Sequence, residues 1–206
     1  MRHFEPCDFY SKEHAGILYD VIFQNRDKLL DNEMRDEIAM MGYFEGQSLK
    51  GTAHVLIAYK NENPVGAVIF ENLPHKKGVF HAALIKNEQN LHEALEFGIV
   101  ATAHAFDVLD YRKLIATIRT QNHTSERVAR GIGFTKEGLH HQDLIVNGSP
   151  VHTVQYGLCA DGWRPKTSRE ALKHILHISR IIRQKRLERK ANDNGRRRTE
   201  TSRNIA

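Results

Sequence analysis

With 206 residues, 40% hydrophobic and 27% charged, the chain has the composition of an ordinary soluble globular protein and the length for one sizeable core. It has no run near the roughly 18 apolar residues of a membrane-spanning helix, and its start lacks the apolar core of a signal peptide. These features argue against a membrane or exported protein and predict a cytoplasmic one. Cys7 and Cys159 stand in no metal or redox spacing, which favours two free thiols.

Charge is distributed unevenly along the chain. From Arg164 to the C-terminus, 14 lysines and arginines stand against four acidic residues, a net charge of +10, whereas the whole chain carries +5. Residues 1–163 are therefore mildly acidic, at −5. We expect a globular domain over residues 1–163 and a basic appendage over residues 164–206, with different roles.

The first part of the chain predicts two helices and then three strands. Residues 11–30 repeat apolar side chains at spacings of three, four and seven, and Ser11 is a suitable helix cap. A second, shorter helix is expected from residue 31 or 32 to near Gly42. Runs rich in β-forming residues predict strands at 53–59, 65–70 and 79–85, with a turn at 61–64 between the first two.

The second part mixes helices and strands. A long helix is expected at 91–109, a short strand at 114–118 and a short helix at 125–132, closed by Gly133. Two further strands flank Asn147 and Gly148, a strong hairpin signal. Strand runs mixed with crossover helices predict an α/β or α+β fold whose sheet is partly antiparallel.

The segment from Asn122 to Gly138 carries a motif. It resembles the late motif of the GCN5-related N-acetyltransferases (GNAT), in particular of the ribosomal-protein N-acetyltransferase branch. The matching positions are Asn122, Ser125, Val128, Gly133, Phe134, Glu137 and Gly138. Together with the order of elements, the resemblance covers residues 2–163. It implies a GNAT fold, with a mixed, mostly antiparallel sheet, two splayed parallel strands and flanking helices.

The resemblance also implies a binding site for acetyl-CoA as co-substrate. The splayed strands would be residues 79–85 and 114–118, with backbone amides near Leu84 and Ile85 polarising the thioester carbonyl. Asn122 would hold the splay open or touch the cofactor, and Ser125 would open the short helix beside the pantetheine arm. The alternative is that Asn122 is simply a turn or cap residue.

The cofactor loop departs from the family pattern. Family members have a glycine-containing loop at the start of the long helix, where backbone amides and the helix dipole favour the diphosphate. This chain lacks both glycines there, and Glu88 adds an anion. Asn87 or Asn90 would mimic a glycine by adopting left-handed backbone geometry. The predicted cofactor-binding positions of this loop are Lys86, Asn87, Gln89, Asn90, Leu91 and His92.

Three residues are candidates for proton transfer. His81, on the strand before the loop, and Glu71, at the end of the preceding strand, are candidate bases. Tyr156, on the last strand, is a candidate acid, because Ala129 stands where many family members have a tyrosine. Each has an ordinary structural interpretation as well: a histidine at the edge of the core, a solvated strand end and a core tyrosine. The other histidines show no metal-ligand spacing, so we expect no metal.

The basic appendage predicts a helix from Thr167 or Ser168 to about Lys190, followed by a disordered cationic tail. Its first half has an apolar face that suits docking onto the domain or a partner. The stretch between Arg183 and Arg198 is a candidate surface for nucleic acid or a protein partner, through attraction to phosphates more than by base reading.

Two functions remain open. The first is transfer of acetyl from acetyl-CoA to a primary amine of a protein, peptide or small molecule. The second is a GNAT fold without catalysis, as in some bacteriophage internal virion or head proteins, which would lie beside packaged DNA. The residues of the 86–92 loop discriminate between the two.

Overall fold

The computed structural model describes residues 2–25, 37–146 and 148–163. The end of the first predicted helix, the start of the second, Asn147 and the whole appendage from Arg164 lie outside these ranges. Within them, none of the helices is both long enough and apolar enough to cross a membrane.

A seven-stranded mixed sheet forms the centre of the domain, in the order β1-β2-β3-β4-β5-β7-β6. The strands β4 and β5 run parallel, and the other neighbours run antiparallel. This confirms the predicted mixed, mostly antiparallel sheet. The strands are β1 (Arg2–Pro6), β2 (Ala53–Lys60), β3 (Asn63–Leu73), β4 (Lys77–Leu84), β5 (Lys113–Arg119), β6 (Thr135–Val146) and β7 (Ser149–Cys159).

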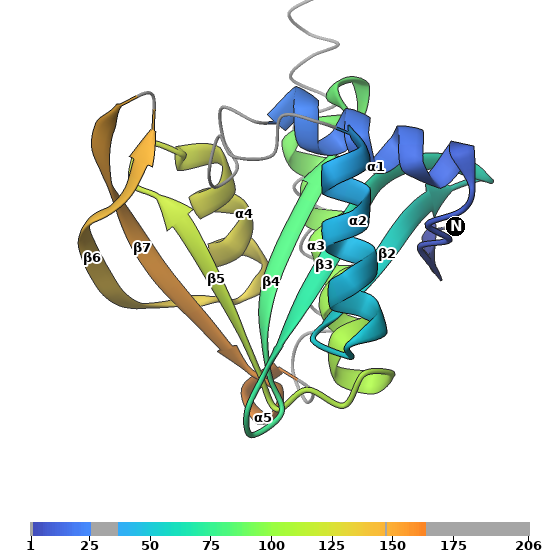
Figure 1. Ribbon diagram of the computed structural model, residues 1–206. Coiled ribbons are helices and arrows are strands. Elements are labelled where there is room, and N and C mark those ends of the chain that lie inside the picture. Colours follow the sequence, from blue (N-terminus) through green and yellow to red (C-terminus); the bar gives the residue numbers. More distant parts are fainter. Residues whose placement is uncertain (1, 26–36, 147, 164–206) are drawn as a thin grey trace, which may run out of the picture. The chain divides into compact units, whose positions relative to one another are not determined.

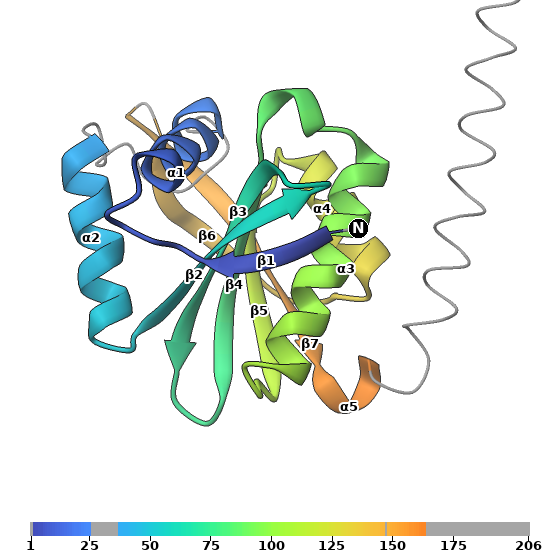
Figure 2. The ribbon, with the colours of Figure 1, turned by 90° about the vertical axis from the view of Figure 1, so that its right-hand side faces the viewer.

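Two pairs of helices cover opposite faces of the sheet (Figure 2). Helices α1 (Lys12–Asn25) and α2 (Glu37–Leu49) pack on one face, where Leu18, Val21 and Phe44 share a core cluster with Val55 and Ile57 of β2. Helices α3 (Leu91–Asp107) and α4 (His123–Ile132) lie on the other face. A short helix, α5 (Ala160–Trp163), follows β7. Since both faces are covered over β2 and β3, these strands read as nearly continuous apolar runs.

The parallel strands β4 and β5 separate along their length. Residues 77–79 pair with residues 113–115, and the described strands then continue to Leu84 and Arg119 without pairing to each other. Figure 1 shows them close together near α5 and diverging toward the opposite end. The predicted splay is therefore present, and the sheet opens at the carboxyl ends of β4 and β5.

Several predicted boundaries need correction. Gly42 does not end the second helix, which continues to Leu49, because a single glycine weakens a helix without terminating it. The first strand was missed: residues 2–6 are too few for a clear alternation, and pairing with β2 makes them a strand. Ser11 does cap α1, since its hydroxyl accepts the His14 amide at 3.3 Å.

Candidate active site

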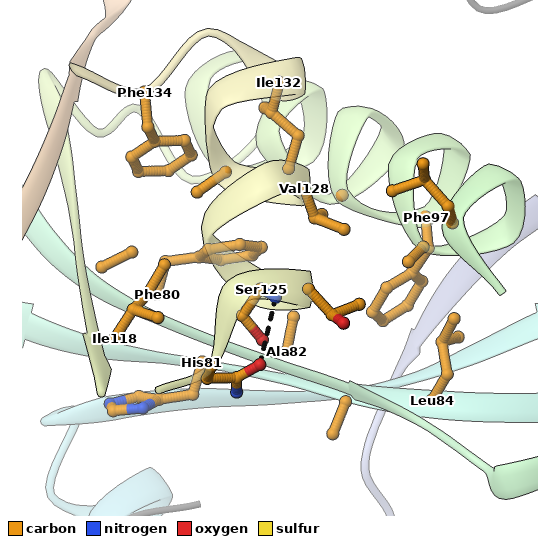
Figure 3. A pocket seen from close by; sticks show the side chains of 18 of the residues that line it. Phe80, His81, Ala82, Leu84, Phe97, Ile118, Ser125, Val128, Ile132 and Phe134 are labelled. Atoms are coloured by element: carbon orange, nitrogen blue, oxygen red, sulfur yellow. Dashed lines mark hydrogen bonds between the residues drawn. The ribbon is translucent and has the colours of Figure 1, made fainter. Parts of the chain in front are cut away.

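A pocket of about 370 Å³ lies where β4 and β5 separate. Helices α3 and α4 line it on their face of the sheet. Figure 3 shows Phe80, Phe97, Val128, Ile132 and Phe134 around it. We call β4, the loop 86–90 and α3 the β4 wall, and β5 with α4 the β5 wall. The lining is mostly apolar, with polar groups near the open end of the splay. These polar lining residues are His81, Gln89, Asn90, Thr117, Arg119, Asn122, Thr124 and Ser125.

In the β5 wall, Asn122 caps α4. Its Oδ1 accepts the backbone N–H of Ser125 at 3.2 Å, and its carbonyl accepts the amide of Glu126 at 3.1 Å. The helix therefore begins at His123, two residues before the predicted start. At its other end Gly133 adopts a left-handed φ of 114°, which few residues other than glycine tolerate. Asn122 and Ser125 both line the pocket, so Asn122 is a cap and a wall residue at once.

In the β4 wall, backbone polar groups of β4 face the splay. The Ile85 amide donates to Val65 of β3 at 3.0 Å, so it is not available to polarise a thioester carbonyl as predicted. Because successive amides of a strand point in opposite directions, those of Ala82 and Leu84 point toward the splay. The Gln89 side chain reaches into the same region and donates to the Leu84 carbonyl at 2.8 Å.

The cofactor loop is built without left-handed residues. Residues Lys86–Glu88 form a 3-10 turn, and Asn90 is extended, with φ of −130°. The proposed glycine mimicry by Asn87 or Asn90 is therefore wrong. Asn90 instead caps α3, with Oδ1 accepting the Glu93 amide at 3.0 Å. Of the predicted cofactor residues, Leu84, Gln89, Asn90 and Leu91 line the pocket. Ile85 packs toward α1 and α2, and Lys86, Asn87 and His92 lie outside the lining.

His81 and Glu71 form a pair beside the pocket. His81 Nε2 lies 3.3 Å from Glu71 Oε1, and only His81 of the two belongs to the lining. The hydrogen bond from His81 lowers the pKa of Glu71 below its ordinary value, against the opposing effect of burial. By the register of β3, β4 and β5, both side chains lie on the sheet face that carries α1 and α2. A carboxylate that orients a histidine is an arrangement suited to a general base.

Tyr156 is not among the residues that line the pocket. It is 2% exposed, and its hydroxyl is hydrogen-bonded to Glu126 and Arg130 on α4. Burial raises its pKa. These contacts make it an anchor of α4 against β7, and the structure gives no support to the prediction that it is the acid. Ala129, at the position of the family tyrosine, lines the pocket.

Sequence reasoning missed two polar residues of the β5 wall. Arg119 is only 9% exposed and lines the pocket with Thr117. The strand was expected to end at Ile118, which left Arg119 in a loop. The sequence signal that could have identified Arg119 as a pocket residue is its position three residues before Asn122 of the motif.

One group among the described residues has ligand atoms close enough for a metal ion. Those of His92, Glu93 and Glu96 lie within 4.8 Å of one another. Acidic groups that reach solvent often gather in this way without an ion, and Glu93 is already bound by Lys60 at 2.9 Å.

Comparison with known proteins gives a consistent result. A family model described as "Acetyltransferase (GNAT) domain" matches residues 18–135. RimJ of Mycobacterium smegmatis, solved with CoA-disulfide, is 15% identical with a TM-score of 0.71, over 84% of this chain and 88% of that one. Spermidine N-acetyltransferase of Vibrio cholerae, solved with CoA and spermine, is 11% identical with a TM-score of 0.70, over 79% and 97%. Ribosomal-protein-S5-alanine acetyltransferase of Vibrio fischeri is 16% identical with a TM-score of 0.64, over 80% and 96%. Among curated protein sequences, none matches this chain.

Proposed function

Because the chain belongs to the GNAT acetyltransferase family, as its sequence predicted, we propose that it transfers an acetyl group from acetyl-CoA directly to a primary amine. The observation that carries this proposal is the pocket itself. An apolar pocket opens where β4 and β5 no longer pair with each other, backbone amides of Ala82 and Leu84 point into the splay, and His81 lines it.

The two faces of the splay suit the two substrates. The α3 and α4 face is apolar at Phe80, Leu84 and Ile132, which suits a pantetheine arm. The opposite face carries His81 and Glu71 and is the side from which an amine would approach. The backbone amide of Ala82 is positioned to pair with an extended amide chain, as an added strand would.

The chain's residues would chiefly position the reactants and accept a proton. Bound acetyl-CoA supplies a thioester, at whose carbonyl carbon the free amine forms a C–N bond while the C–S bond breaks. The second proton lost by the attacking nitrogen passes to the departing thiolate, directly or through water. His81 Nε2 lies 3.3 Å from Glu71 Oε1, and this contact orients the imidazole so that a ring nitrogen can accept the ammonium proton, directly or through water. Ionised Glu71 stabilises the histidine cation that results. Positioning in a water-poor channel supplies the rest of the acceleration.

For the acceptor we propose a protein or peptide amine. The resemblance of the 122–138 motif to the ribosomal-protein branch supports it, as does similarity of fold to RimJ and to ribosomal-protein-S5-alanine acetyltransferase. The similar fold of spermidine N-acetyltransferase makes polyamines the second class to screen.

Calorimetric titration of the full chain with acetyl-CoA tests the proposal. The titration belongs in moderate salt, because the basic segment from Arg164 would otherwise attract CoA phosphates non-specifically. We expect saturable one-to-one binding that Asn122→Ala weakens, followed by acetylation of an amine in a screen of peptides and polyamines. Wild-type protein that binds no acetyl-CoA would contradict the proposal.

A second candidate function is a GNAT fold that no longer catalyses, such as an internal virion protein. The observation that favours it is the loop 86–90, which lacks the family glycines and forms a 3-10 turn. In that case the segment between Arg183 and Arg198 would be the functional part, binding nucleic acid or a partner. Binding of duplex DNA without any binding of acetyl-CoA would favour this candidate.

A further inference from the structure

Two acidic residues of the β4 wall, Glu88 and Glu93, lie at the N-terminus of α3. Glu88 is in the 3-10 turn and Glu93 in the first turn of α3. Under the proposed function, on which this inference rests, the diphosphate of acetyl-CoA lies against the N-terminus of α3. Carboxylates there oppose the attraction between the helix dipole and an anion.

A single lysine contacts both acids. Lys60 ends β2, 28 residues before Glu88, and its Nζ lies 3.3 Å from Glu88 Oε2 and 2.9 Å from Glu93 Oε1. The three side chains are 34%, 27% and 15% exposed, respectively. Solvent therefore screens these pairs less than it screens pairs on an open surface. Lys60 both reduces the local negative charge and ties the loop to the helix that follows it.

The backbone of the loop gives little alternative support for an anion. The amides of Glu88, Gln89 and Asn90 donate to loop carbonyls at 2.9–3.2 Å. Three amides that a glycine-containing loop would turn outward are therefore used inside the loop. The electrostatic potential at the diphosphate position therefore depends on the charged side chains around it and on where those side chains are positioned.

We propose that Lys60 is a positioning residue for the acyl donor. It draws the carboxylates of Glu88 and Glu93 to itself, so that the first turn of α3 presents the positive end of its dipole to the diphosphate.

Replacement of the lysine by methionine tests this on the full chain, with two probes. CoA carries the diphosphate, and S-acetylpantetheine carries the same arm without any phosphate. By calorimetry we expect Lys60→Met to raise the Kd for CoA about fivefold in moderate salt, where the basic segment from Arg164 attracts CoA phosphates less, with a smaller change in high salt. The Kd for S-acetylpantetheine should stay at the wild-type value. The double variant Lys60→Met with Glu88→Gln should recover most of the lost CoA affinity.

A matched control uses Lys76, which forms an ion pair with Asp110 at 2.5 Å, at the opposite end of β4. Lys76→Met loses the same charge and should bind CoA as the wild type does. Equal weakening for both probes, or no recovery in the double variant, would mean that Lys60 is merely structural and would overturn the inference. Unchanged CoA affinity in Lys60→Met would overturn the inference about Lys60 and leave the proposed function standing. Wild-type protein that does not bind CoA would overturn both.

Discussion

The two walls of the pocket keep the family pattern to different degrees. The β5 wall retains the motif, and three of its residues have a visible geometric role: Asn122 caps α4, Gly133 ends it and Phe134 stacks on Phe80 with ring centroids 5.9 Å apart. The β4 wall has lost the glycines and carries acids that Lys60 holds. The difference teaches that backbone geometry requires particular residues at particular positions. Charge, in contrast, can be supplied by a residue distant in sequence, and no motif then records it.

The largest expected effect is a difference in kcat between a variant in the β4 wall and a variant in the β5 wall. His81→Ala, in the β4 wall, should lower kcat by about a hundredfold, because it removes the proposed base. Thr117→Val, in the β5 wall, also changes a polar lining residue and should keep a rate close to the wild type. Steady-state kinetics with the best acceptor from the screen measure both. Comparable losses in the two variants would show that the walls do not divide the chemistry in this way.

Backbone spacing behind the β4 wall gives the next effect. A Cβ added at Gly66 would lie 2.5 Å from the Ala83 carbonyl oxygen and 3.1 Å from Leu84 Cα. Because backbone atoms cannot rotate away, Gly66→Ala should lower the free energy of unfolding by about 1–3 kcal/mol. Gly42→Ala, in α2 with nothing within 4 Å, should raise it by about 0.5–1 kcal/mol. Urea unfolding measures both, and a stable Gly66→Ala would show that β3 and β4 can separate.

The two helix caps at the open end should have similar effects on stability. Asn90 caps α3 and Asn122 caps α4, each through Oδ1. Replacing either with alanine should cost about 1 kcal/mol in the free energy of unfolding, whereas serine should retain most of the cap. Thermal unfolding compares the four variants. A loss with serine as large as with alanine would show that the asparagine does more than cap its helix.

The smallest effect is a pH dependence at the His81 and Glu71 pair. The histidine lowers the pKa of Glu71 in the folded protein, so the pair adds stability above the unfolded-state pKa, near 4.5. This contribution is lost as the pH falls through the lowered folded-state pKa. In His81→Ala the pKa of Glu71 should return toward its ordinary value, which carboxyl-detected NMR titration measures. An unchanged Glu71 titration would show that the contact is not maintained in solution.

Much of the fold followed from local sequence. The hairpin of β6 and β7, the long helix and the helix after Asn122 depend on caps, glycines and periodicity that lie within a few residues of each other. Two other features depend on pairing across the chain and left little local trace. The strand β1 is defined by pairing with β2. The Ile85 amide points toward β3, and not into the splay, because it donates to the Val65 carbonyl.

The candidate site was predicted less completely than the fold. Residue type and motif singled out His81, Asn122 and Ser125, which all line the pocket, and Glu71, which contacts His81. It could not show that the Tyr156 hydroxyl bonds to α4, since that depends on how a strand and a helix pack. Arg119 and Lys60 were missed because each stands at a strand end, where periodicity gives no information about a neighbour from another part of the chain.

The short pairing between β4 and β5 has a mechanical consequence. Backbone hydrogen bonds join the two halves of the sheet over residues 77–79 and 113–115, and beyond that point α3 and α4 hold the halves together by packing. We therefore expect the angle between the half-sheets to change more readily than the strand pairing within each half, and a ligand that spans the gap to restrain it. Amide hydrogen exchange should slow on ligand binding in β4 after Val79 and in β5 after Ile115, while β2 and β3, paired along their length, exchange as before.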